Sequence, residues 1–299
     1  MRSLWPALLC LVLAGCQTRK SESLHIDPAL EALVPADTVF IAGANVDAIR
    51  DTPVYQKLLS RMPLPQLDEF ARRTGLDPRK DLSQVLSCSN GKSGLLMARG
   101  KFQPQELEAR LEANGAKRLA YKKYNLFGDD RAAIFFWNAS TAIAGPTAEL
   151  RSMIDQTGGR GLPAPLRDLL RTLPSGDQIY AALAGGLEGL NLAIPQESNL
   201  GNIMNVLRAI DSATLGMDLH SGIAVTAEVT SKTERDAKFV HDMVKGVVGL
   251  GRLNTPTNQP ELLKLYDAIQ VEQQQTHTKV MADIPADLAD RFLDLWLKR

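Results

Sequence analysis

Apolar residues from Pro35 onward recur with a period of two in some segments and of three to four in others, patterns typical of strands and of amphipathic helices. The two kinds of segment alternate along the chain. The shorter period predicts strands at 38–46, 93–99, 117–125, 131–137, 141–145, 177–184, 213–219 and 223–229, with 271–284 as a strand or a hairpin. The longer period predicts helices at 53–62, 65–74, 103–114, 147–156, 202–210, 234–248, 260–268 and 285–297.

Residues with turn chemistry separate these elements. Gly75 is expected to end the helix at 65–74. Asp129-Asp130 is expected to form the turn between the strands at 117–125 and 131–137. His220-Ser221-Gly222 is expected to form the turn of a later hairpin.

The pattern starts again after a stretch rich in glycine and proline at 158–165. Each half closes in the same way, with an apolar strand, a proline (Pro146 or Pro285) and a helix. Strands that are crossed by helices and mixed with hairpins are typical of the α+β class. We therefore expect two related modules, each a mostly antiparallel sheet with helices packed on one face. A single larger sheet built from both halves is the alternative.

The N-terminus has the features of a secretion signal. Arg2 supplies a positive charge, and the ten residues from Leu4 to Leu13 form an apolar stretch too short to span a bilayer, which needs about 20 residues. The stretch ends in Leu13-Ala14-Gly15-Cys16. This sequence resembles the lipobox of bacterial lipoproteins, Leu-(Ala/Ser)-(Gly/Ala)-Cys. The resemblance covers residues 1–17 and implies cleavage before Cys16, a diacylglycerol on its sulfur, and usually a further acyl chain such as palmitate on the new amine.

Lipidation of Cys16 implies a lasting membrane anchor, because two or three acyl chains hold a protein far more firmly than one. Asp after the cysteine tends to retain Gram-negative lipoproteins in the inner membrane, so Gln17 favours the outer membrane, facing the periplasm. Residues 17–28 are polar and are expected to form a flexible spacer.

A second, weaker resemblance concerns the start of the first module. Val34-Pro35-Ala36-Asp37, followed by Thr52-Pro53, is similar to a group of uncharacterised exported bacterial proteins. That resemblance implies tandem α/β modules and transfers no catalytic residue. The chain is therefore expected to divide into a signal peptide at 1–15, a lipidated tether at 16–32, a first module at 33–157, a linker at 158–165 and a second module at 166–299.

Composition narrows the classes of partner. The chain has 34 basic and 34 acidic residues, and loss of Arg2 with the signal leaves a net charge of about −1, too little to attract nucleic acid. Cys10 is lost with the signal as well. With Cys16 lipidated, Cys88 is the one remaining thiol, so no internal disulfide is expected. Cys88 is expected to be partly buried rather than reactive.

No segment carries a complete catalytic or ligand-binding motif. Gly91-Lys92-Ser93 resembles the end of a P-loop, but Leu86 stands where the motif needs its first glycine, so a turn is expected. The Gly-x-Ser-x-Gly motif of hydrolases is absent. Asp129-Asp130 lacks the pattern of a calcium loop.

Isolated polar and aromatic groups have simpler interpretations. His220 and His277 would meet only if their strands pair, and like His25 and His241 they have no neighbours at metal-binding spacing. A strand with basic and aromatic residues is expected to face solvent; its members are Arg118, Tyr121, Lys122, Lys123 and Tyr124. In Phe135-Phe136-Trp137, Phe136 faces away from its neighbours; one of the two faces is expected to be core, and the other to pack on helices, on the second module or on a partner.

We therefore assign no catalytic, cofactor-binding or metal-binding residue, and predict one modified residue, Cys16. The preferred hypothesis is a membrane-anchored, non-catalytic lipoprotein of the cell envelope that binds an envelope protein or helps organise the envelope. The alternative is an envelope hydrolase or small-ligand carrier with its site in the groove between the modules. No cofactor is expected, and enzymatic activity stays open.

Overall fold

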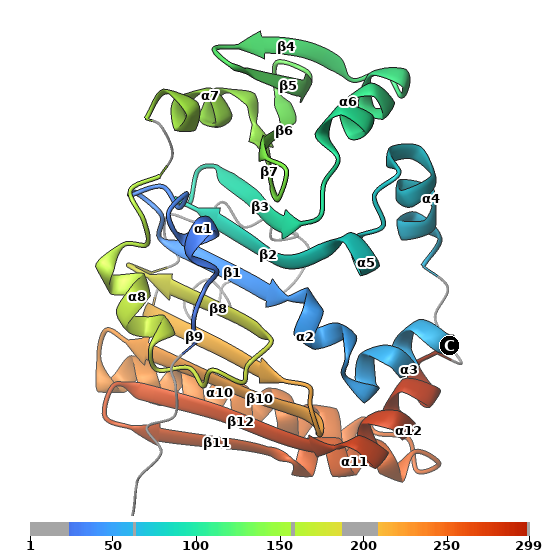
Figure 1. Cartoon of the computed structure of the whole chain (residues 1–299). Coiled ribbons are helices and arrows are strands. Elements are labelled where there is room, and N and C mark those ends of the chain that lie inside the picture. The colour runs from blue at the N-terminus through green and yellow to red at the C-terminus, as the bar shows by residue number, and fades with distance from the viewer. Residues whose placement is uncertain (1–23, 62–63, 157–158, 187–208, 298–299) are drawn as a thin grey trace, which may run out of the picture.

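The computed structural model describes residues 24–61, 64–156, 159–186 and 209–297 (Figure 1). In these residues, eleven helices accompany twelve strands that form one sheet. All neighbouring strands in the sheet are antiparallel. The expected α+β class is therefore confirmed.

The strands lie in the order β11-β12-β10-β9-β8-β1-β2-β3-β7-β6-β5-β4 across the sheet. The first half of the chain contributes β1 (Phe40–Asn45), β2 (Leu82–Ser89), β3 (Gly94–Gly100), β4 (Lys117–Tyr121), β5 (Tyr124–Gly128), β6 (Ala132–Asn138) and β7 (Thr141–Pro146). The second half contributes β8 (Ile179–Ala184), β9 (Ile210–Asp218), β10 (Gly222–Ser231), β11 (Ile269–Gln274) and β12 (His277–Pro285).

The two halves join edge to edge within this sheet. β1 pairs with β8, from Phe40 opposite Leu183 to Ala44 opposite Ile179. Read outward from this junction, β1-β2-β3-β7-β6 and β8-β9-β10-β12-β11 follow one scheme: three successive strands, then the last strand of the half, then the strand before it. The structure thus has the single larger sheet that the sequence left as an alternative, made of two parts with like topology.

Helices follow or connect the strands in both halves. Their bounds are α1 (Pro28–Glu31), α2 (Val46–Arg50), α3 (Pro53–Arg61), α4 (Pro65–Thr74), α5 (Pro78–Asp81), α6 (Pro104–Ala113), α7 (Thr147–Asp155), α8 (Ala164–Leu170), α10 (Glu234–Leu253), α11 (Pro260–Asp267) and α12 (Ala286–Leu297). Gly75 ends α4 in the left-handed conformation, with φ of 78°, as the sequence predicts. The helix expected at 202–210 lies almost wholly outside the described residues.

Helices cover both faces of the sheet rather than one. Leu166 and Leu170 of α8 share the main core with Ala182 of β8. The next residue, Leu183, points to the other face, where a row of cross-strand partners leads through β9 and β10 to Thr278 on β12. Thr278 is fully buried there, and its hydroxyl donates to the Ala237 carbonyl of α10 at 3.0 Å. Figure 1 accordingly shows α8 in front of the sheet and α10 behind it.

The alternation of side chains along β6 divides the first half into two apolar layers. Phe135 is fully buried in the main core and lies edge-on to the Trp137 ring, with centroids 6.2 Å apart. Phe136 lies on the opposite face, 5.7 Å from the Phe102 ring and packed on the small cluster that includes Leu107 of α6. Of the partners expected for Phe136, the helices are therefore the ones that it contacts.

Two strands that the sequence did not reveal complete the first half. β2 includes Cys88 and lies in a segment for which the sequence predicted no strand. β5 arises because the strand expected at 117–125 turns back at Lys122, whose φ is 53°. Asp129 therefore lies in the turn between β5 and β6, the second turn after residue 117 and not the first. Lysine rarely adopts this backbone conformation compared with glycine, so the sequence carries no turn signal there.

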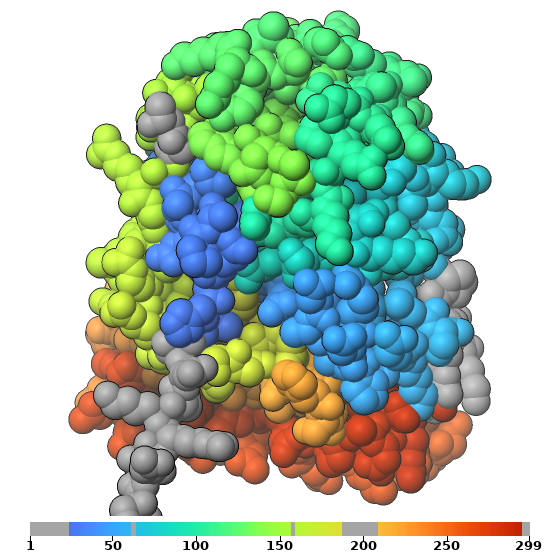
Figure 2. All heavy atoms as spheres, viewed as in Figure 1, coloured from blue at the N-terminus to red at the C-terminus, as the bar shows by residue number. Residues whose placement is uncertain are grey.

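Residues 24–32, expected to belong to the tether, are part of the folded body. Leu24 donates its backbone N–H to the Leu173 carbonyl at 3.1 Å, and Leu24, Ile26 and Leu30 are buried in the main core. The side chain of Asp27 accepts from Ala29 N–H at 2.7 Å and so starts α1 ahead of Pro28. Figure 2 shows these first residues, in dark blue, lying between the green first half and the yellow-green region of α8. The polar spacer is shorter than the sequence suggested.

Candidate functional site

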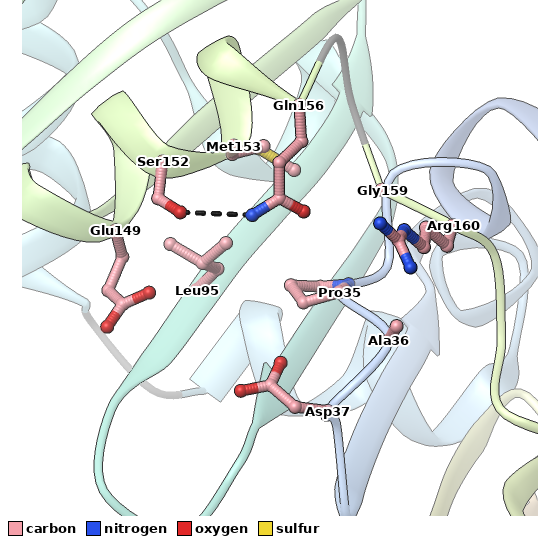
Figure 3. Close-up of a pocket in the computed structure, with 10 residues that line it drawn as sticks. All are labelled: Pro35, Ala36, Asp37, Leu95, Glu149, Ser152, Met153, Gln156, Gly159 and Arg160. Atoms are coloured by element: carbon pink, nitrogen blue, oxygen red, sulfur yellow. Dashed lines mark hydrogen bonds between the residues drawn. The ribbon is translucent and has the colours of Figure 1, made fainter.

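A cleft of about 280 Å³ opens between α7, the turn before β1 and the connection that follows α7 (Figure 3). Its lining residues are Pro35, Ala36, Asp37, Leu95, Glu149, Ser152, Met153, Gln156, Gly159 and Arg160. Leu95 and Met153 belong to the main core and supply the apolar part of the wall. The polar groups come from segments that lie far apart in the sequence, so the cleft exists only in the folded chain.

Two carboxylates line the cleft, and each is held by a side chain from the turn between β2 and β3. Asn90 Nδ2 donates to Asp37 Oδ2 at 2.7 Å. Ser93 Oγ donates to Glu149 Oε1 at 3.0 Å. Figure 3 shows the two acids approaching from different elements, Glu149 from α7 and Asp37 from the turn before β1. Both acids keep further lone pairs that can accept hydrogen bonds from a ligand.

The connection between the two halves closes the cleft with Gly159 and Arg160. Arg160 donates its backbone N–H to the Val34 carbonyl at 3.2 Å, so this connection runs directly against the turn before β1. Glycine is required at 159 because a Cβ there would lie 2.3 Å from the Leu33 carbonyl carbon. The close approach places a guanidinium group at a cleft that also has two carboxylates.

Cys88 lies beside the cleft, in a narrow space that shares Asp37 and Glu149 with it. The thiol is almost fully buried, with 2% of the residue exposed. Burial raises the pKa of Cys88 to about 11, although hydrogen bonds involving Leu95 and Thr38 act in the opposite direction. The thiol is therefore protonated at neutral pH and is a weak nucleophile.

The chemistry of the cleft suits binding better than hydrolysis. Its carboxylates, hydroxyl and guanidinium offer both acceptors and donors to a small polar molecule. Among the lining residues, Ser152 carries the hydroxyl group that could act as a nucleophile, but its Oγ accepts a hydrogen bond from the amide Nε2 of Gln156 at 3.1 Å (Figure 3). An amide cannot take a proton from a serine as a general base does. Among the residues that line the cleft, none is a histidine.

A second polar cluster lies at the ends of β8 and β9. Gln178 is buried; its Nε2 donates to Asp218 Oδ1 at 3.3 Å and its Oε1 accepts from Leu219 N–H at 2.6 Å. His220 Nδ1 lies 2.7 Å from the same Asp218 oxygen. Burial raises the pKa of Asp218, but hydrogen bonds from His220 and Gln178 outweigh it and leave that pKa below its usual value.

Asp177 is the unusual member of this cluster. It is 9% exposed, and its Oδ2 is buried without a hydrogen-bond partner among the described residues. Burial, with the Asp218 charge as a smaller cause, raises the pKa of Asp177 to about 6. Gly216 makes room for this carboxyl, since a Cβ at 216 would lie 1.9 Å from Asp177 Oδ2. Sequence reasoning missed this pair because Asp177 and Asp218 become neighbours only through the register of β8 and β9.

The structure places the other candidates of the sequence apart from both clusters. His277 lies opposite Thr230, whereas His220 lies at the other end of β10, so antiparallel pairing separates the two histidines. His277 Nδ1 lies 3.1 Å from Glu228 Oε1. Gly91-Lys92-Ser93 forms the β2–β3 turn, where the Asn90 side-chain oxygen accepts from the N–H groups of Lys92 and Ser93. The turn interpretation of this segment is confirmed.

The remaining candidate residues of the sequence form a turn or make contacts at the surface. Asp129 Oδ1 accepts from the N–H groups of Arg131 and Ala132, as a hairpin turn requires, and these bonds lower the pKa of Asp129. On the basic-aromatic strand, Lys122 pairs with Asp155 at 2.6 Å, and Tyr121 donates to the same carboxylate at 2.8 Å. Acidic neighbours thus neutralise part of this surface. Cys16 and Gln17 lie outside the described residues, so lipidation stays a prediction.

Two further features are absent from the described part of the chain. No group of three or more His, Cys, Asp or Glu side chains there is placed to hold a metal ion. No helix there combines the length and the apolar character needed to cross a membrane.

No protein-family model and no curated protein matches the chain. Among solved structures, crystal form I of TP0453 is 8% identical, with a TM-score of 0.47, and covers 91% of this chain and 98% of its own. Crystal forms IV and III are 9% and 10% identical, each with a TM-score of 0.48, and cover 91% and 92% of this chain and 97% and 99% of their own. At this similarity the comparison carries no argument about function.

Proposed function

We propose that this chain is a lipid-anchored protein of the bacterial cell envelope that acts by binding a partner and not by catalysis. The lipobox at Leu13–Cys16 supports the anchor. The observation that carries the proposal is that Leu24, eight residues after Cys16, is already buried in the main core. Eight Cα–Cα steps span at most about 26–29 Å. A lipid on Cys16 therefore holds the body close to the membrane surface.

The partner that we propose is another protein of the envelope, bound on the membrane to which Cys16 is attached. Gln17 favours the outer membrane, with the body facing the periplasm. The continuous twelve-stranded sheet supports a binding role because it offers a broad, rigid body on a short tether. Two acyl chains or more keep this body at the surface permanently.

Intact mass and membrane fractionation test the anchor, with the wild-type chain expressed in a Gram-negative host beside Cys16→Ala. The wild type is expected to lose residues 1–15, gain acyl mass and sediment with membranes, while Cys16→Ala does none of these. Cys88→Ala is the matched control, because this thiol is buried and is expected to leave processing unchanged. A wild-type protein that stays unprocessed and soluble would refute the anchor.

The cleft beside Asp37 and Glu149 favours a second candidate, a carrier of a small polar ligand. Its volume of about 280 Å³ is at the lower end of the range for small-molecule sites. Because two carboxylates are held there by Asn90 and Ser93, an amine or ammonium group is the ligand chemistry that fits best.

Calorimetry with small diamines and amino sugars tests this candidate. Asp37→Asn/Glu149→Gln is expected to abolish heat of binding that the wild type shows. Asp129→Asn, an acid outside the cleft, is the control and is expected to bind as the wild type does. Equal binding by all three proteins would place the ligand elsewhere.

A further inference from the structure

The outward face of α10 is apolar and largely exposed in the described structure. Val247 is 62% exposed, Leu250 61% and Leu253 83%. Phe239, nearer the start of the helix, is 40% exposed. At 100° per residue these four side chains fall within about 120° of one another. They form one stripe along a helix of 20 residues, which we call the α10 stripe.

This stripe borders the face of α10 that holds the helix to the sheet, because Val247 lies about 20° around the helix from the buried Val240. Ala237 and Val240 are buried, and the Ala237 carbonyl accepts the hydroxyl hydrogen of Thr278 on β12. Gly251 lies on the same inward side, where a Cβ would lie 2.5 Å from the Tyr266 ring of α11. The helix thus has one apolar face used in packing and a second one exposed. Exposed leucine and valine that gather on one face indicate an interaction surface.

The charges on α10 suit an anionic surface. Lys238, Lys245 and Arg252 follow one another at seven-residue intervals, so they lie in a row on one side of the stripe. Lys238 pairs with Asp242 at 3.4 Å and Arg252 pairs with Asp267, which leaves Lys245 as the cation of this row without an acidic partner among the described residues. The acids of α10 end at Asp242, and the segment 243–260 carries Lys245 and Arg252 with no acidic residue. An apolar stripe with basic residues along one side is typical of helices that lie in the interface of a bilayer.

We propose that the α10 stripe binds the lipid surface, with Val247, Leu250 and Leu253 among the acyl chains and Lys245 at anionic headgroups. This inference rests on the proposed anchor in one respect. A lipid at Cys16, at most about 29 Å of chain from Leu24, keeps the helix at a high effective concentration near the bilayer. The helix then acts as a second attachment, which fixes how the body is oriented.

Vesicle sedimentation tests the inference without the anchor. The protein used starts at Gln17, carries no lipid and keeps every residue that the structure describes. It is expected to bind vesicles of phosphatidylcholine with 30% phosphatidylglycerol more tightly than vesicles of phosphatidylcholine alone. In Leu250→Glu/Leu253→Glu, the lipid concentration for half-binding is expected to rise at least tenfold.

The matched control is Phe70→Glu/Leu96→Glu, which places two acids at exposed apolar residues away from α10, 42% and 49% exposed. It is expected to bind as the wild type does. Circular dichroism checks that both variants keep their helix content and thermal midpoint. A dye on Leu253→Cys is expected to shift its emission to the blue when vesicles are added, because Leu253 enters an apolar layer.

Two results would overturn the inference: no vesicle binding by the unlipidated protein, or equal binding by both double variants. Self-association that the Leu250→Glu/Leu253→Glu change removes, without vesicle binding, would assign the stripe to a second copy instead. These results are independent of the anchor, which the mass and fractionation of the full chain decide. If the full chain is not acylated while the protein that starts at Gln17 binds vesicles, the anchor is refuted and the inference about α10 is not.

Discussion

Asp177→Asn provides the sharpest test of the energetics of this fold. Asp177 Oδ2 is buried without a hydrogen-bond partner among the described residues, next to the Asp218 carboxylate. Burial raises its pKa from the ordinary 3.8 to about 6. The folded state therefore holds the Asp177 proton more tightly than the unfolded chain does. Stability from this proton is complete below pH 3.8 and is lost as the pH rises through about 6.

The size of the effect follows from this difference in pKa. At about 1.4 kcal/mol for each pKa unit, the loss of folding free energy between pH 4 and pH 7.5 is at most about 3 kcal/mol. Asparagine at 177 has no charge to bury, so this loss should disappear. We expect Asp177→Asn to gain stability relative to the wild type as the pH rises, with most of the gain between pH 4 and pH 7.

Urea unfolding followed by circular dichroism at pH 4.5, 5.5, 6.5 and 7.5 measures this gain in the protein that starts at Gln17. Asp129→Asn is a control of opposite sign, because hydrogen bonds from Ala132 and Arg131 lower the pKa of Asp129. That variant should lose stability relative to the wild type only as the pH rises through the region at and below the ordinary 3.8, so its difference from the wild type is expected to be nearly constant at the four pH values measured. A constant difference between Asp177→Asn and wild type at all four pH values would refute the reasoning.

Three further predictions concern packing. Gly246→Ala should raise the free energy of unfolding by about 0.5–1 kcal/mol in a denaturant titration, because no atom lies within 4 Å of a Cβ there, whereas Gly251→Ala should destabilise against the Tyr266 ring. Phe135→Ala should cost about 3–5 kcal/mol in the same titration, since the ring is fully buried; a cost below 1 kcal/mol would contradict its place in the core. Cys88 should react with a thiol reagent at pH 8 only when urea is added, because burial raises its pKa to about 11; rapid labelling of the native protein would contradict this.

Local patterns in the sequence determined much of the fold. Gly75 and the prolines that end β7 and β12, Pro146 and Pro285, marked element ends that the structure confirms, because caps and fixed φ angles act within a few residues. The alternation at Phe135-Phe136-Trp137 likewise predicted two faces. The hairpin at Lys122 escaped notice, because a lysine in the left-handed region carries no local signal.

Only the tertiary structure decided how distant segments meet. The pairing of β1 with β8 joins the halves into one sheet. The first residues of these two strands, Phe40 and Ile179, are 139 positions apart in the sequence. The same holds for Asp37 with Glu149, for Asp177 beside Asp218, and for the burial of Leu24 and Ile26 in the core. Burial of apolar surface is non-directional, so it sets which residues are inside without setting their neighbours. The lipobox, by contrast, is recognised as a linear segment and needs no tertiary structure. Membrane anchoring is therefore the part of the proposed function that the sequence alone predicts.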